Sequence, residues 1–126
     1  MRLTTPLARV RGLGSAKDGT KHWWAQRLTA IALVPLTVFF AIAVISMTGG
    51  GYTEAKAIMG HPVVCALWIL FLIALFHHAQ LGLQVVLEDY LHDEAIKFAS
   101  IIVMKFAIVL LGTICVVSVL RAAFGS

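Results

Sequence analysis

Two adjacent histidines, His77 and His78, follow a long apolar stretch at residues 63–75. An imidazole in hydrocarbon costs free energy unless a partner satisfies it, so the pair needs an explanation. A neutral imidazole is the usual axial ligand of haem iron, and it also forms hydrogen bonds between membrane helices. The pair therefore indicates either a cofactor ligand or an interhelical contact.

The helix around His77 and His78 limits how the pair could bind a cofactor. Gly82 follows four residues later on the same helical face, where the missing side chain leaves room for a flat macrocycle. Neighbouring side chains on a helix point about 100° apart, so at most one of the two histidines faces a given cofactor. A six-coordinate haem at His78 would need its second axial ligand from another chain or a second copy.

A carboxylate and a phenol, Asp89 and Tyr90, follow His78 by 11 and 12 residues. Eleven helical residues advance about 16 Å in about three turns, which brings Asp89 close to the face of His78. A tyrosine hydroxyl at the membrane interface can donate a hydrogen bond to a carbonyl oxygen. Tyrosine is also common in the interfacial belt and aspartate in loops, so the spacing alone leaves both interpretations open.

Three long apolar blocks must position these residues. The chain has 126 residues, of which 60% are hydrophobic and only 13% charged. Each block has roughly 20 residues or more, enough to cross a hydrocarbon core about 30 Å thick as a helix. The sequence therefore predicts an all-α membrane protein with a single domain over residues 1–126. It has an interfacial arm at 1–27 and three transmembrane helices at about 28–47, 63–87 and 98–120.

Glycines and polar residues predict the two connections between the spans. The glycines at 49–51 are expected to end the first helix, and a short loop with Glu54 and Lys56 follows. Pro62 suits the first turn of the second helix. The polar residues at 88–97 predict a second short loop.

The distribution of basic residues predicts the orientation of the spans. The loop after the first span has only Lys56, whereas six basic residues precede that span: Arg2, Arg9, Arg11, Lys17, Lys21 and Arg27. The positive-inside rule then places the N-terminus and the loop 88–97 in the cytoplasm, with Arg27, Asp89 and Tyr90 at one membrane face. The same clustering favours a topology signal over a nucleic-acid surface as the reason for the net charge of +4.

The pattern H-x-x-x-G-x-x-x-x-x-x-D-Y, formed by His78, Gly82, Asp89 and Tyr90, resembles the second-helix motif of a known family. That family is the D-type hydrophobic membrane anchor of succinate dehydrogenase, also called respiratory complex II. Residues 27–31 (RLTAI) resemble the R-x-T-A-[IV] sequence that starts the family's first span. Chain length, three spans and a cytoplasmic N-terminus agree with it as well.

The resemblance implies a haem b shared with a second anchor subunit of the C type, with His78 as the axial ligand from this chain. It also implies that Tyr90 donates a hydrogen bond to a carbonyl of ubiquinone. Asp89 is expected to order that site and its proton supply.

Three further residues are expected at the cofactor. The resemblance implies that Arg27 lies near the haem propionates and the quinone, and Gly82 is expected to make room for the haem. His22 is a candidate propionate neighbour, although its spacing to Arg27 differs by one residue from that in the family.

The resemblance also implies partners and a location. The chain would dock an iron–sulfur subunit and a flavoprotein subunit in the inner membrane of a bacterium, since no transit peptide is evident. It would not oxidise succinate itself, because the sequence has no flavin motif or cysteine cluster; Cys65 and Cys115 each lie in an apolar block. Two alternatives stay open: a cofactor-free structural or assembly protein, and another small cytochrome b subunit.

Overall fold

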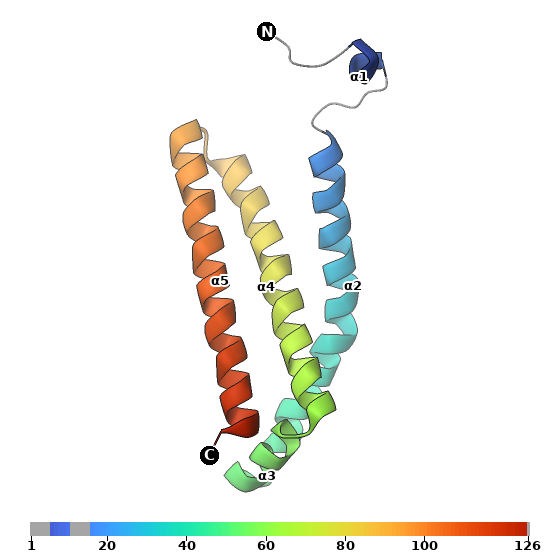
Figure 1. Cartoon of the computed structure of the whole chain (residues 1–126), viewed down its shortest axis with the longest axis vertical. Coiled ribbons are helices and arrows are strands. Elements are labelled where there is room, and N and C mark those ends of the chain that lie inside the picture. The colour runs from blue at the N-terminus through green and yellow to red at the C-terminus, as the bar shows by residue number, and fades with distance from the viewer. Residues whose placement is uncertain (1–5, 11–15, 126) are drawn as a thin grey trace.

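The computed structural model describes residues 6–10 and 16–125, and each regular element in those ranges is a helix (Figure 1). The helices are α1 (Pro6–Val10), α2 (Ala16–Met47), α3 (Gly51–Met59), α4 (Pro62–Tyr90) and α5 (Glu94–Phe124). Residues 1–5, 11–15 and 126, and the side chains of residues 8, 9 and 16–18, lie outside this description. Much of the predicted arm is among them.

Three helical segments are long and apolar enough to cross a membrane: Gly19–Met47, Pro62–Tyr90 and Glu94–Phe124. The predicted all-α class with three spans is therefore confirmed, whereas the cytoplasmic N-terminus stays a prediction. Each helix extends beyond the apolar block that predicted it. α2, for example, already begins at Ala16 and so includes the last part of the predicted arm.

The predicted loop after the first span is wrong, because that segment forms α3. Gly51 has a φ of 73°, a backbone conformation that glycine adopts readily, and it lets the chain turn between α2 and α3. α3 then crosses the end of the layer (Figure 1), where Met59 is buried against Cys65 and Ala123. Burial of Met59 stabilises this helix, because a helix of 9 residues is not stable in isolation.

The predicted loop 88–97 is also shorter than expected, since only residues 91–93 lie between α4 and α5. Asp93 caps α5 by accepting a hydrogen bond from the backbone N–H of Ile96 at 3.0 Å. α4 runs without interruption to Tyr90. Asp89 and Tyr90 therefore belong to the last turn of the helix that carries His78.

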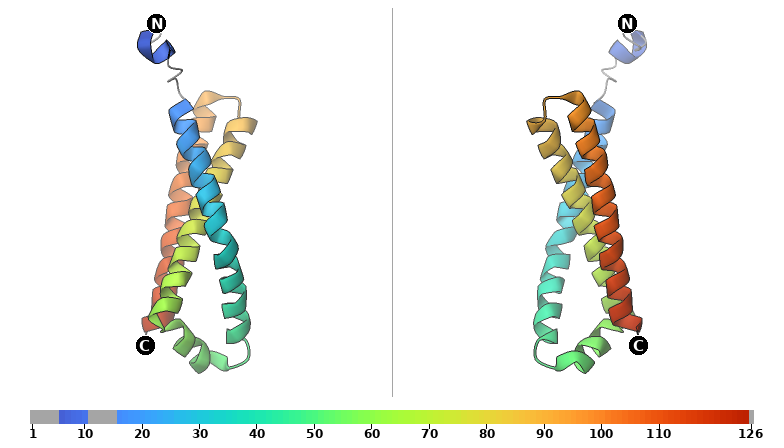
Figure 2. Two further views of the ribbon diagram at one scale, coloured as in Figure 1. Left: turned by 90° about the vertical axis from the view of Figure 1, so that its right-hand side faces the viewer. Right: turned by 90° about the vertical axis from the view of Figure 1, so that its left-hand side faces the viewer.

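The three long helices form an open layer with α4 in the middle (Figures 1 and 2). α4 packs against both α2 and α5, whereas α2 and α5 do not meet within the described part of the chain. Only 6%, 11% and 0% of the most apolar stretches of α2, α4 and α5 are buried. The layer therefore leaves most of its apolar surface for lipid or for a partner subunit.

An aromatic cluster joins α2 to α4 in the half of the layer nearer to α3. Phe40 stacks on Phe71 with 4.7 Å between ring centres, and it meets Trp68 edge to face at 4.9 Å. Such pairs stabilise a helix contact beyond the area that they bury. Farther from α3, the contact between the same two helices becomes polar.

Cysteine labelling tests the predicted orientation. The connection 91–93 lies at the end of the layer where α2 begins, opposite the turn after Met47 (Figure 1). With both native cysteines replaced by alanine, His92→Cys should react with a membrane-impermeant maleimide in inside-out vesicles but not in right-side-out ones. Gly49→Cys should show the reverse. Both positions are exposed in this chain, and labelling would be done on the anchor expressed without the soluble subunits; the opposite pattern would contradict a cytoplasmic N-terminus.

Candidate functional site

A groove of about 570 Å³ lies between α2 and α4 in the half of the layer away from α3. Its lining residues repeat every three or four positions, so they form one face of each helix. They are Gly19, His22, Trp23, Gln26, Arg27 and Ala30 from α2, and His78, Gly82 and Val85 from α4. Since Trp23, Arg27 and Val85 are exposed, the groove opens to the outside of the layer.

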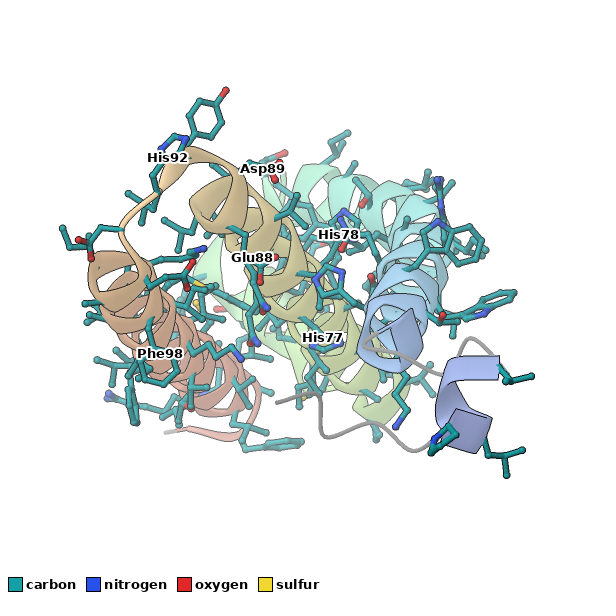
Figure 3. All side chains as sticks on the ribbon, turned by 90° about the horizontal axis from the view of Figure 1, so that it is seen from above. His77, His78, Glu88, Asp89, His92 and Phe98 are labelled. Atoms are coloured by element: carbon teal, nitrogen blue, oxygen red, sulfur yellow. The ribbon has the colours of Figure 1, made fainter. Side chains whose placement is uncertain are left out.

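The ring of His78 lies between α4 and α2 (Figure 3) and is partly buried. Its Nδ1 is 3.0 Å from the hydroxyl oxygen of Thr29 on α2. Within the described residues, the other ring nitrogen, Nε2, has no hydrogen-bond partner. His78 therefore combines a fixed orientation with one ring nitrogen that is free to bind something else.

The two adjacent histidines serve different faces of α4, as Figure 3 shows. His77 is exposed and lines a separate groove between α4 and α5, together with Gln80 and Thr113. His78 alone faces α2 and the groove that contains Gly82. The structure thus separates the pair as the helical geometry requires.

Among the described side chains of α2, two buried polar atoms have no hydrogen-bond partner: Nε2 of His22 and Oε1 of Gln26. The two residues lie one turn apart, and both line the groove beside His78. Buried polar atoms are normally paired, because an unpaired one costs its full desolvation energy. Both atoms are therefore open to a polar group from outside the described residues, as is Nε1 of Trp68 away from the groove.

Gly82 deepens the groove one turn away from His78. A Cβ atom at this position would meet only the amide nitrogen of Gln26, at 3.9 Å, which is an ordinary contact. Packing within this chain therefore does not require glycine here. The space that glycine leaves belongs to the groove.

The remaining predicted site residues lie at the same end of the layer and are open to the surroundings. The guanidinium of Arg27 sits 5.4 Å from the centre of the Trp23 ring. Asp89 and Tyr90 are exposed in the last turn of α4, and Tyr90 is 78% exposed. In the described part of the chain, Arg27 and Asp89 form no ion pair. These charged and phenolic groups are available to a partner or a ligand.

Sequence reasoning missed the contributions of Gln26 and Thr29. Both follow His22 on α2 at positions i+4 and i+7, so the three polar side chains recur on one face of the helix. This periodicity was the signal that one face of the first span meets a polar partner.

His78 is not part of a metal cage made by this chain alone. In residues 6–10 and 16–125, no three histidine, cysteine, aspartate or glutamate side chains are grouped so that they could hold a metal ion. Cys65 and Cys115 are free thiols. A metal at His78 would need a prosthetic group or ligands from another chain.

Three spans in an open layer, together with a groove lined by two helices, define a small helical membrane subunit. Comparison with known proteins identifies the family. Residues 1–112 match the model of the succinate dehydrogenase/fumarate reductase transmembrane subunit family. The chain belongs to that family, and it is a membrane anchor subunit of succinate dehydrogenase, an oxidoreductase complex, as the sequence motifs predicted.

Individual relatives agree with this assignment. The chain is 35% identical over 106 residues to the succinate dehydrogenase hydrophobic membrane anchor subunit of Paracoccus denitrificans, which covers 84% of this chain and 82% of the relative. The subunit of the same description from Rickettsia bellii is 29% identical over 79% of each chain. The succinate dehydrogenase membrane anchor subunit of Porphyra purpurea is 32% identical over 85% of this chain and 87% of its own length. No solved structure shows a significant match.

Proposed function

We propose that this anchor subunit supplies one axial ligand, His78, to a haem b that it shares with a second anchor subunit. We further propose that Tyr90 and Asp89 form part of the site where ubiquinone is reduced. The observation that carries the haem proposal is the free Nε2 of His78 in a groove that also contains the buried, unpaired Nε2 of His22.

The groove suits both parts of a haem. Ala30, Gly82 and Val85 offer apolar walls to the macrocycle, while His22 and Arg27 carry donors for its propionates. The spacing of His22 to Arg27 differs by one residue from that in the family, but the buried, unpaired Nε2 of His22 supports its assignment. One-electron redox chemistry is what a haem would supply when bound here.

The second axial ligand must come from outside this chain. In the described part of the chain, α2 and α4 form the walls of the groove, and the exposed lining residues leave its outer side open. A second anchor subunit packed on this side would close the groove and bring its own histidine opposite His78. The large exposed apolar surface of the layer supports such a partner.

The end of α4 supports the quinone proposal. A phenol donates one hydrogen bond, and the highly exposed hydroxyl of Tyr90 is free to donate it to a quinone carbonyl. Asp89, the preceding residue, is also exposed and can pass a proton between water and the site. We place the docking of the iron–sulfur subunit, and through it the flavoprotein, at this end, in the inner membrane of a bacterium.

A cofactor-free structural role is the alternative that one observation favours. The hydrogen bond between His78 and Thr29 is by itself a reasonable helix-packing contact. It uses only one ring nitrogen, however, and it leaves the buried atoms of His22 and Gln26 unexplained. A haem would use the free Nε2 of His78, and a propionate oxygen would accept a hydrogen bond from Nε2 of His22.

Replacement of each histidine by leucine tests the haem ligand. In the purified complex, we expect His78→Leu to abolish the low-spin haem b spectrum of the parent, through haem loss or changed axial ligation. His77→Leu is the matched control, because it changes the adjacent residue on another face of α4. An unaltered haem spectrum in the His78 variant, or selective loss in the His77 variant, would refute the assignment.

Filling the groove tests its use by the haem. Gly82→Leu should lower the haem content of the assembled complex, because the new side chain occupies the space beside His78. Gly82→Ala is the control, since its Cβ would make only the 3.9 Å contact with Gln26. Haem content would be measured per flavin in complexes of equal subunit composition. Full haem content with leucine would mean that the macrocycle lies elsewhere.

The two tyrosines offer a matched test of the quinone site. Tyr52 and Tyr90 are each 78% exposed, at opposite ends of the layer. Loss of one hydrogen bond from the transition state corresponds to a rate decrease of about 2- to 10-fold. Tyr90→Phe should slow ubiquinone reduction by this factor and leave the haem spectrum unchanged, while Tyr52→Phe should change neither. Equal rates in the two variants would exclude the proposed role of Tyr90.

A further inference from the structure

We propose that Thr29 is a positioning residue for the haem: it holds His78 in the tautomer with its proton on Nδ1 and its lone pair on Nε2. This inference rests on the proposed role of His78 as an axial ligand. It goes beyond that role by naming the side chain of a different helix that prepares the ring for iron.

The hydrogen bonds of Thr29 determine the direction of its contact with His78. The Thr29 hydroxyl lies 2.7 Å from the backbone carbonyl oxygen of Ala25 and 3.1 Å from that of Gln26. A carbonyl oxygen only accepts, so the single hydroxyl hydrogen is donated to this pair of oxygens. The Thr29 oxygen is then left as an acceptor toward His78.

The contact of 3.0 Å between Thr29 Oγ1 and His78 Nδ1 therefore requires the ring to donate. In neutral imidazole, a proton on Nδ1 leaves the lone pair on Nε2, which is the form that binds a metal. The opposite tautomer would place two lone pairs against each other at this distance. Thr29 thus selects the metal-binding tautomer before any cofactor arrives.

The same bond also orients the ring and tunes it as a ligand. Thr29 is β-branched and is held by its own helix, so its oxygen is a fixed point to which the His78 ring is tied across the α2–α4 interface. An acceptor on the remote N–H of a metal-bound histidine raises the basicity of the ligand. Loss of such a partner typically weakens metal binding about 10- to 100-fold.

This arrangement gives a physical role to residues 27–31, the segment that resembles the start of the family's first span. Arg27 and Ala30 line the groove, and Thr29 between them reaches His78 on the neighbouring helix. The segment therefore contributes a donor at the groove, an apolar wall and the acceptor that orients the ligand.

Thr29→Val tests the inference, because valine keeps the branched shape and removes only the hydroxyl. In the purified complex, we expect haem to bind about 10- to 100-fold more weakly in a haem-transfer assay to apomyoglobin. We also expect a higher reduction midpoint potential of the haem, because a less basic ligand stabilises ferric iron less. Thr29→Ser retains the hydroxyl and should keep both properties near those of the parent.

Parental haem affinity and midpoint potential in Thr29→Val would overturn the inference, as would changes of equal size in the serine variant. If the valine variant does not assemble, Thr29→Ala provides the same comparison with serine, since a smaller side chain cannot clash. The proposed function is tested separately, because a parental haem spectrum in His78→Leu would show that His78 is not an axial ligand. Haem loss in His78→Leu together with no effect of Thr29→Val would refute only the role of Thr29 and would leave the ligand assignment intact.

Discussion

The site depends on one constraint: each nitrogen of an imidazole between membrane-spanning helices needs a hydrogen-bond partner or a metal. In His78 the two uses are separate. Nδ1 binds the Thr29 hydroxyl and joins α4 to α2, while Nε2 stays available at the groove. Helix packing and ligand binding, which the sequence presented as alternatives, are therefore compatible in one ring, and the packing contact would prepare the proposed ligand.

The rest of the fold follows from a layer that is stable only with partners. α4 packs between α2 and α5, and the aromatic cluster around Phe40 fixes one half of its contact with α2. Neither broad face of the layer is covered within the described chain, and the groove has two helical walls. In our proposal a membrane anchor of this shape holds half of a site, and its exposed charged and phenolic groups lie at the end where electrons would arrive.

The sequence predicted the elements that local patterns specify. It did not predict the elements and bonds that depend on contacts between helices. Three apolar blocks sufficed for the spans, and helical spacing alone separated His77 from His78. The sequence did not show that the segment after the glycines is helical, because α3 depends on burial of Met59 against the ends of other helices. The bond between Thr29 and His78 joins residues 49 positions apart, which no local pattern reveals. The second ligand of the proposed haem, and the proposed quinone, would lie outside this chain altogether.

A cryo-electron microscopy map of the purified complex, at a resolution that shows ring orientation, is the most direct test of the central claim. The account predicts a macrocycle in the α2–α4 groove with its iron on Nε2 of His78, and Nδ1 of the same ring within hydrogen-bond distance of Thr29. Iron on His77, iron on Nδ1 of His78, or a groove filled by a helix of the second anchor subunit would contradict it.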